Sequence, residues 1–325
     1  HLTGCSMNDI DRTNTRVIVA MSGGVDSSVA AALLVEQGYE VVGMTMRVAS
    51  GEGRESSSKA CCTLDAADDA RRVADTLGIR HYVLNYVQRF EQEVISDFLT
   101  EYAAGRTPNP CSRCNQRVKF GALYEKALAI DASAIATGHY ARTERRGDRV
   151  ALLRAIDRNK DQSYTLAGLG QDQLRRAIFP LGEMTKEQTR EIARKLGLVT
   201  ANKPESQEIC FVPDDNYRNF LAKRGVVSSA GPIVTRGGEL VGHHSGLTNY
   251  TVGQRKGLGI AAPRPYYVVK IDIARNALVI GHEDDTLCGR LVAGQVSWCA
   301  IPPQAGPFDC TVQVRYTCRP VPCTV

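Results

Sequence analysis

The sequence predicts an α/β protein that begins with a doubly wound parallel sheet and continues into a small β-rich domain and further strands. Up to about residue 200, runs rich in β-branched residues alternate with segments of helical length, which is typical of parallel sheets. Beyond residue 204, glycine becomes frequent and the pattern changes to that of β-hairpins. We expect a flexible N-terminus over 1–13 and domains over 14–203, 204–284 and 285–325.

The elements of the first domain follow in order along the chain. Residues 16–21 (RVIVAM) predict a strand, the Ala/Leu-rich segment to Gln37 a helix, and residues 39–48 the next strand, which together form a βαβ unit. The alternation continues with a helix ending at Gly78, a strand over 79–85, a helix ending at Gly105, a strand over 133–140, and helices over 171–178 and 185–197.

Towards the end of the chain, residues 265–281 alternate as in hairpins, and residues 290–298 and 308–325 are again strand-like. Residues 55–62 (ESSSKACC) predict a mobile loop.

Composition excludes several classes of protein. Hydrophobic residues make up 43% and charged residues 23% of the 325 residues, and no apolar stretch approaches the ~18 residues that a membrane helix needs. The first 16 residues lack the apolar core of a signal peptide, so we expect a cytoplasmic protein. In such a compartment, eleven cysteines indicate metal binding or thiol chemistry in preference to a disulfide scaffold.

The net charge of +5 is concentrated in one segment. Residues 142–160 contain seven basic and three acidic side chains and so carry +4 of it. Two interpretations remain open: a surface that contacts the phosphates of a nucleic acid, or a solvated hairpin rich in arginine.

The glycine pair Gly23–Gly24 stands where the first strand turns into the first helix. Without side chains there, backbone N–H groups can converge on an anion, and the helix N-terminus adds its positive end. A phosphate group is the expected occupant. The turn lacks the lysine of the GxxxxGK[ST] loop and does not match GxGxxG, but the string SGGVDS over 22–27 resembles the PP-loop of ATP pyrophosphatases.

Three cysteines stand in settings suited to chemistry. Cys111 and Cys114 lie in a proline-bounded loop before a helix (TPNPCSRCNQRVKF), and Cys210 lies in ESQEICF. A helix N-terminus and basic neighbours favour the thiolate, the form that attacks or ligates. A lone CxxC is also compatible with half of a structural zinc site, although no matching half at the usual spacing follows.

Seven strings now occur in one order along the chain: SGGVDSS, TPNPCxxCNxxxKF, ATGHYAR, KDQSY, SQEICF, TxGQRKGLGI and VRY…PVPC. In that order they resemble the bacterial tRNA-specific 2-thiouridylases. The resemblance implies a PP-loop domain like the adenine nucleotide alpha hydrolases over 14–203, a central β-rich domain, and a C-terminal β-barrel domain that is incomplete in this sequence. It also implies ATP-dependent adenylation of the C2 carbonyl oxygen of the wobble uridine, followed by sulfur transfer.

The resemblance also assigns roles to residues. Cys114 is expected to be the nucleophile and Cys210 the persulfide carrier, with a disulfide between them after the reaction and a mobile loop around Cys210. Met46 is also compatible with core packing, and His139 with a structural role. The residues expected to bind ATP are Ala20, Met21, Ser22, Gly23, Gly24, Val25, Asp26, Ser27, Met46 and Gly138; the target base, Asn109, Pro110 and Cys111; and the tRNA, His139, Lys160, Asp161, Gln162, Arg315 and Tyr316.

Cofactors and partners follow from the same resemblance. ATP and Mg²⁺ are expected, with the wobble-uridine tRNAs for Lys, Glu and Gln, a sulfur-donor protein (a cysteine desulfurase or a sulfur-relay carrier), and no membrane. Because Cys111 replaces an aspartate of the best-known members, Cys111, Cys114 and Cys210 could instead hold a [4Fe–4S] cluster. The shorter C-terminal domain puts tRNA affinity in doubt.

Two other functions stay open at this point. One is a PP-loop ligase or amidotransferase that acts on a small metabolite and needs neither RNA nor the two cysteines. The other is an iron–sulfur or zinc RNA-binding module that consumes no ATP, which the SGGVDS string disfavours.

Overall fold

The computed structural model describes residues 15–48, 64–204, 209–212 and 216–325. The chain forms two compact units, described separately below: residues 1–87, 111–206 and 296–325 in the first, and 88–110 and 207–295 in the second. The flexible terminus predicted over 1–13 and the loop over 55–62 lie outside the described residues, as does most of the loop predicted around Cys210. The boundaries at 203 and 284 remain predictions.

The first unit contains a parallel sheet with the strand order β3-β2-β1-β4-β7, in which every pair is parallel. The predicted doubly wound sheet is therefore confirmed. The chain runs outward from β1 through β2 to β3 and then returns to the other side of β1, so the order reverses between β1 and β4. In such sheets, ligands bind at the carboxyl edge beside this reversal. The strands are β1 Arg16–Ala20, β2 Glu40–Arg47, β3 Arg80–Asn85, β4 Ala134–Thr137 and β7 Ala177–Ile178.

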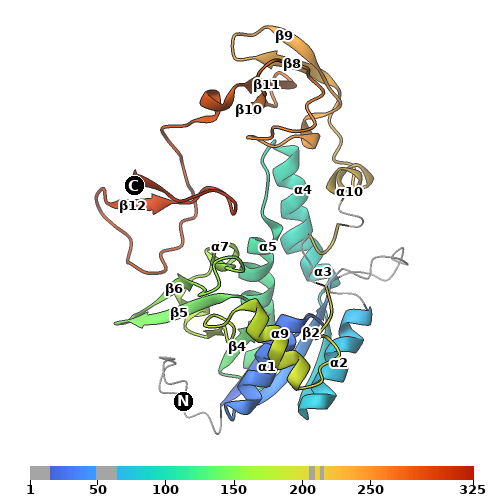
Figure 1. The fold of residues 1–325 in the computed structure, drawn as a ribbon, viewed down its shortest axis with the longest axis vertical. Coiled ribbons are helices and arrows are strands. Elements are labelled where there is room, and N and C mark those ends of the chain that lie inside the picture. The colour runs from blue at the N-terminus through green and yellow to red at the C-terminus, as the bar shows by residue number, and fades with distance from the viewer. Residues whose placement is uncertain (1–14, 49–63, 205–208, 213–215) are drawn as a thin grey trace. The chain divides into compact units, whose positions relative to one another are not determined.

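Helices α1, α2 and α9 pack around this sheet (Figure 1). α1 (Val25–Glu36) has eight buried residues out of twelve, because it contacts both the sheet and α9. α2 spans Leu64–Leu77. α9 (Lys186–Lys195) begins with a capping box: Thr185 accepts a hydrogen bond from the Gln188 amide, and the Gln188 side chain accepts one from the Thr185 amide.

The segment that carries Cys111 and Cys114, which belongs to the first unit from Cys111 onward, forms one continuous helical stretch. It consists of α5 (Pro110–Arg113), a π-helical section (Cys114–Ala122) and α6 (Leu123–Leu128). The helix predicted to end at Gly105 consists of α3 (Val87–Phe90), a π-helical section (Glu91–Ile95) and α4 (Ser96–Ala103), and it belongs to the second unit from Gln88 onward. π-Helical sections are rare and often occur at functional sites.

The basic segment 142–160 forms the hairpin β5 (Ala141–Arg146) and β6 (Arg149–Arg154). α7 (Ser163–Leu166) follows it. The C-terminal hairpin β12 (Asp309–Val312) and β13 (Val321–Thr324) belongs to the same unit.

Two predictions of secondary structure are wrong. The helix predicted over 171–178 ends early: α8 covers only Gln171–Leu174, and Ala177–Ile178 become β7 because their backbone pairs with Ile135 and Ala136 of β4. The strand predicted over 290–298 does not form; Leu291 and Val292 are exposed, and no strand of the described chain pairs with this segment. In both places, the presence or absence of a pairing partner overrides local preference.

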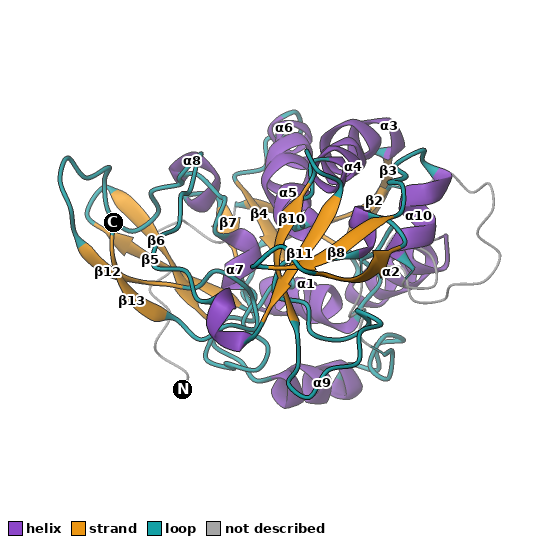
Figure 2. Ribbon diagram, turned by 90° about the horizontal axis from the view of Figure 1, so that it is seen from above, coloured by secondary structure: helices purple, strands orange, loops and turns teal. Residues whose placement is uncertain are grey.

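The second unit contains a four-stranded sheet, seen from above in Figure 2, with the order β10-β11-β8-β9. Its core consists of apolar side chains from strands β8, β10 and β11, together with Leu247 of the 3₁₀ turn Leu247–Asn249 and with Tyr250 and Leu258 from the loop that follows. A second 3₁₀ turn covers Glu283–Thr286. The elements are α10 Tyr217–Lys223, β8 Gly231–Thr235, β9 Leu240–His244, β10 Tyr267–Asp272 and β11 Ala277–Gly281. The β-rich character predicted for this part of the chain is confirmed.

The packing of the glycine turn gives a first prediction. Gly23 has φ +65°, and a Cβ there would lie 2.1 Å from the carbonyl oxygen of Ala66 in α2. Gly78 has nearly the same φ of +66°, but a Cβ on Gly78 would meet no atom within 4 Å. We expect Gly23→Ala to destabilise the first unit by about 2–5 kcal/mol, from φ strain plus overpacking, and Gly78→Ala by about 1–2 kcal/mol.

Urea unfolding followed by the fluorescence of Trp298, the single tryptophan, which belongs to the first unit, measures both losses. Equal losses in the two variants would contradict the role given to the Ala66 contact.

Candidate functional site

The glycine turn is held by its own serines. The Ser22 amide donates to Ser27 Oγ at 3.1 Å, and the hydroxyls of Ser27 and Ser28 donate to the Gly24 carbonyl at 3.2 and 2.8 Å. Gly24 is extended (φ −104°) and gives α1 no side-chain cap. The first amides of α1 therefore have neither an intrahelical nor a side-chain acceptor. This cradle fits a phosphate group, as the sequence predicts.

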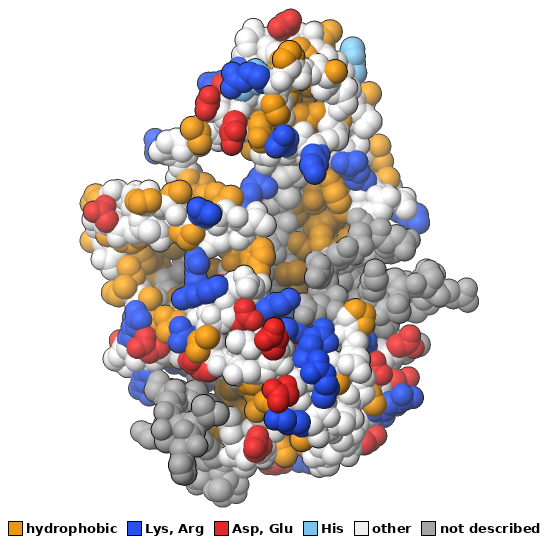
Figure 3. Space-filling view, in the orientation of Figure 1, with side chains coloured by type: hydrophobic (Ala, Val, Ile, Leu, Met, Phe, Trp, Pro, Cys, Tyr) orange, Lys and Arg blue, Asp and Glu red, His pale blue; other side chains and the backbone are white. Residues whose placement is uncertain are grey.

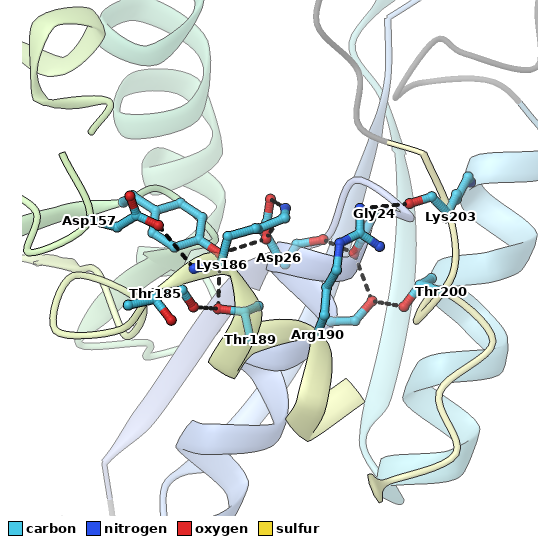
Figure 4. A network of polar contacts seen from close by, with 12 residues as sticks. Gly24, Asp26, Asp157, Thr185, Lys186, Thr189, Arg190, Thr200 and Lys203 are labelled. Carbon is cyan, nitrogen blue, oxygen red and sulfur yellow. Dashed lines mark hydrogen bonds and ion pairs between the residues drawn. The ribbon is translucent and has the colours of Figure 1, made fainter. Parts of the chain in front are cut away.

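Asp26 lies in the first turn of α1 and is fixed by two partners from distant segments. Lys186 Nζ lies 2.8 Å from both carboxylate oxygens (Figure 4). The Tyr140 hydroxyl lies 3.0 Å from Oδ1. The Tyr140 hydroxyl also lies 2.9 Å from Thr189 Oγ1 of α9. The Lys186 side chain is 10% exposed and that of Asp26 31%, so solvent only partly screens this ion pair.

Gly138 and Met46 lie along the same edge of the sheet. A Cβ on Gly138 would be 2.5 Å from the Ser27 amide nitrogen, so the end of β4 presses against the start of α1. Met46 is buried near the end of β2, two residues beyond the residue paired with Ala20. The structure therefore brings the ATP-site candidates 20–27, 46 and 138 to one edge; their contact with ATP remains a prediction.

His139 makes contacts that fit a structural role as well. Its Nδ1 lies 2.7 Å from Thr137 Oγ1, and its ring packs edge-to-face on Phe179. Burial, with the charge of nearby Lys119, lowers the pKa of His139 well below its usual value. The ring is therefore neutral, and any contact with RNA would be a hydrogen bond and not an ion pair.

Two groups of predicted tRNA contacts lie near each other in the first unit. Gln162 exchanges hydrogen bonds with the backbone of Tyr140, and Asp161 accepts from the Ala155 amide at 2.8 Å. Lys160 precedes them on the same turn. Tyr316, next to Arg315, packs edge-to-face against Tyr164 in α7, with ring centroids 6.2 Å apart. The segments 160–162 and 315–316 are thus linked through α7.

The hairpin β5–β6 is less purely basic than its sequence suggests. Figure 3 shows basic side chains in blue beside acidic ones in red over these strands. Arg146 pairs with Glu144, and Arg142 pairs with Glu183. Both interpretations of this segment therefore remain: it is a hairpin rich in arginine, and its role in binding tRNA is a proposal.

The cysteines fall in both units. Cys111 is exposed and Cys114 is half-buried, in the first turns of the helical stretch that begins at the buried Pro110. Asn115, beside Cys114, donates to the Thr165 carbonyl at 3.1 Å, which ties this stretch to α7.

Cys210 belongs to the second unit and is half-buried beside Phe211, whose ring packs on Phe90 and Phe98. The approach of Cys210 to Cys114 remains a prediction, as does the contact of the half-buried Asn109 with the target base. Within the described ranges, no group of three or more His, Cys, Asp or Glu side chains is placed to hold a metal ion. No helix of those ranges is long and apolar enough to cross a membrane.

Three residues of this edge, Lys186, Thr189 and Lys203, were not expected from the sequence. Lys186 lies 160 residues from Asp26 and Lys203 lies 180 residues from Gly23, so no local pattern links them. Tyr140 belongs to the ATGHYAR string, but the sequence predicted no function for it.

A glycine turn and a helix N-terminus at the carboxyl edge of a parallel sheet, beside its reversal, indicate a nucleotide-binding domain, and the string SGGVDS at this turn indicates the PP-loop class of ATP pyrophosphatases. Two family models match the chain: the tRNA methyl transferase HUP domain over residues 15–214 and the tRNA methyl transferase PRC-barrel domain over residues 218–282.

Curated relatives specify the family further. The chain is 50% identical over 323 residues to the tRNA-specific 2-thiouridylase MnmA of Geobacter metallireducens, covering 97% of this chain and 87% of that protein. It is 51% identical over 315 residues to the protein of the same name from Pelotomaculum thermopropionicum, covering 96% and 86%. The chain belongs to the family of tRNA-specific 2-thiouridylases.

Among solved structures, a 4-thiouridine synthetase–RNA complex with bound ATP is similar at a TM-score of 0.37 and 16% identity, covering 65% of this chain and 50% of that one. NMN synthetase from Francisella tularensis is similar at a TM-score of 0.36 and 18% identity, covering 59% and 66%. The family assignment rests on the sequence relatives.

The contacts of Lys186 and Tyr140 with Asp26, called the clamp below, give a second prediction. Lys186→Met leaves the carboxylate without its cation, and we expect a loss of about 1–3 kcal/mol, between the values for exposed and buried pairs. Lys195→Met removes an exposed ion pair with Glu191 from the same helix and is the matched control, with an expected loss below about 0.5 kcal/mol.

Asp26→Asn added to Lys186→Met should recover part of the loss, because the unpaired charge is then gone. Urea unfolding of the four proteins without nucleotide provides the comparison. If Lys186→Met loses no more stability than Lys195→Met, the clamp contributes nothing.

Proposed function

We propose that the protein is an ATP-dependent tRNA-uridine 2-sulfurtransferase that converts the wobble uridine of tRNA to 2-thiouridine. The observation that carries this proposal is an uncapped helix N-terminus at the glycine turn, in a chain about half identical, over nearly its whole length, to proteins named tRNA-specific 2-thiouridylases. A phosphate cradle alone would fit many enzymes. The family narrows the choice to this reaction.

The first step is activation of the uracil. The C2 carbonyl oxygen attacks the α-phosphorus of ATP, the bond from that phosphorus to the bridging oxygen of the β-phosphate breaks, and pyrophosphate leaves. The adenylated oxygen is then a good leaving group. The amides at the start of α1 would hold phosphate oxygens, and Gly138, which has no Cβ, lets the end of β4 lie directly against that helix start. Mg²⁺ is proposed to neutralise part of the phosphate charge.

The second step brings sulfur to C2. A persulfide on Cys210 supplies the sulfane sulfur: either the thiolate of Cys114 attacks the Cys210 sulfur and releases sulfide, which attacks C2, or the terminal sulfur attacks C2 first. AMP leaves with the former carbonyl oxygen. In either case the persulfide is reduced and the two cysteines become a disulfide, which an external thiol must reduce before the next turnover.

The remaining assignments belong to the same proposal. Asn109, Pro110 and Cys111 would contact the target base, since single-stranded anticodon bases can be splayed out and read on their edges. The segments 160–162 and 315–316, with His139, would contact the tRNA. The substrates would be the tRNAs for Lys, Glu and Gln, the sulfur would come from a cysteine desulfurase or a relay carrier, and the compartment would be the cytoplasm.

A [4Fe–4S] cluster on Cys111, Cys114 and Cys210 is the alternative sulfur route. Three thiolates would leave one iron open for the incoming sulfide. One observation favours this route: a third thiol, Cys111, lies three residues from Cys114 in the same helical stretch. An absorption spectrum of anaerobically purified protein distinguishes the two routes, because only a cluster gives a broad visible band that oxygen bleaches.

The function is tested by incubating the protein with ATP, Mg²⁺, tRNA and a cysteine desulfurase with cysteine, and measuring 2-thiouridine and AMP. We expect one AMP per 2-thiouridine, and a loss of at least about a hundredfold in Cys114→Ser and in Cys210→Ser, because each removes a reacting sulfur. Cys288→Ser, at an exposed cysteine outside the proposed machinery, is the matched control and should stay within twofold.

Thiolation that survives both substitutions would contradict the assigned cysteines. ATP consumption that proceeds equally without tRNA would favour the small-metabolite ligase over the tRNA 2-thiouridylase.

A further inference from the structure

The glycine turn contains no cation of its own. No lysine or arginine occurs between Arg16 and Arg47, whereas the GxxxxGK[ST] loop carries a lysine that reaches the terminal phosphates. A helix N-terminus supplies only about half a positive charge. A triphosphate, even with Mg²⁺ bound, therefore brings negative charge to the turn that no side chain of the SGGVDS string neutralises.

Lys203 is placed to supply a cation for this charge. Its Nζ lies 3.0 Å from the Gly23 carbonyl oxygen and 2.7 Å from Asp69 Oδ2 of α2 (Figure 4 shows it at the turn). Its side chain is 27% exposed, so a ligand can reach it. An ammonium has three N–H donors, and these two acceptors use two of them.

The backbone that carries Lys203 is fixed at the same turn by separate contacts. Thr200 Oγ1 donates to Ser28 Oγ at 3.1 Å, and Ser28 Oγ donates to the Gly24 carbonyl. Arg190 of α9 donates to the carbonyls of Ala201 and Lys203. The position of Lys203 beside the turn therefore does not depend on its ion pair with Asp69.

Lys186, the other ammonium at the turn, is differently placed. It makes two 2.8 Å contacts with Asp26, and its side chain is 10% exposed. Its charge already balances a carboxylate inside the cradle. Lys203 is more exposed, and its carboxylate partner lies on α2, outside the SGGVDS string.

We propose that the Lys203 ammonium binds the β- and γ-phosphates of ATP and stabilises the charge of pyrophosphate as it leaves. The inference rests on the proposed function only in that the turn binds ATP. In the free protein the Asp69 carboxylate pairs with the Lys203 ammonium, and its negative charge opposes the phosphates once ATP binds. If Lys203 had a purely structural role and only joined α2 to the turn, removing the Asp69 charge would weaken ATP binding as much as removing the Lys203 charge.

The test compares the binding of Mg·ATP and of AMP to the full-length protein by calorimetry, without tRNA or sulfur donor. Lys203→Gln can still donate to the Gly23 carbonyl but carries no charge. We expect it to bind Mg·ATP at least tenfold more weakly and AMP within twofold of the wild type. Lys203→Arg, which keeps the charge, should lose less than about threefold for ATP.

Asp69→Asn is the matched control, because it removes the same ion pair from the other side. We expect it to bind Mg·ATP as tightly as the wild type or more tightly. The inference is overturned if Asp69→Asn weakens ATP binding as much as Lys203→Gln does, or if Lys203→Gln loses ATP and AMP affinity equally. It is also overturned if the wild type does not prefer ATP to AMP.

Thermal unfolding of each variant shows whether it is folded. Should Lys203→Gln be unfolded, Lys203→Met and Lys203→Arg carry the same comparison. ATP binding that depends on Lys203 in a protein that thiolates no tRNA would refute the proposed function and leave this inference standing. Thiolation of tRNA by Lys203→Gln with an unchanged KM for ATP would support the proposed function and refute this inference.

Discussion

The close packing of the glycine turn between α2 and β4 is the constraint on which the rest of the site depends. The space where Gly23 would carry a Cβ is filled by the Ala66 carbonyl, and the corresponding space at Gly138 is filled by the start of α1. Because both neighbours are backbone, the turn has little freedom to move. The amides at the start of α1 are consequently held in one orientation before any ligand arrives, which is the condition for electrostatic stabilisation without reorganisation.

Charges brought from distant segments complete this edge of the sheet. Lys186 balances Asp26 inside the cradle, and Lys203 balances Asp69 beside it. Both lysines come from the part of the chain that includes α9 and the segment after it, which packs on α1. The Lys203 ammonium can exchange its carboxylate for a phosphate because the Asp69 side chain, 28% exposed, is hydrated when it loses its cation.

Much of this arrangement could be predicted from the sequence, where the signal is local. The strand, the glycine pair and the apolar helix of 16–37 are contiguous, so their pattern predicted β1, the turn and α1 together. The clamp of Lys186 and Tyr140 on Asp26 could not be predicted, because it joins residues 114 and 160 positions apart. Residues 177–178 were misassigned for a related reason: only the neighbouring strand makes them β. The roles of Cys114 and Cys210 came from resemblance and remain proposals.

The fate of the uracil oxygen tests the account most directly. If ATP held at this turn activates the C2 carbonyl, tRNA carrying ¹⁸O at C2 of the wobble uridine must transfer that atom to AMP when sulfur replaces it. Mass spectrometry should find one ¹⁸O in AMP for each 2-thiouridine formed. Label in inorganic phosphate, or unlabelled AMP accompanying thiolated tRNA, would contradict the account.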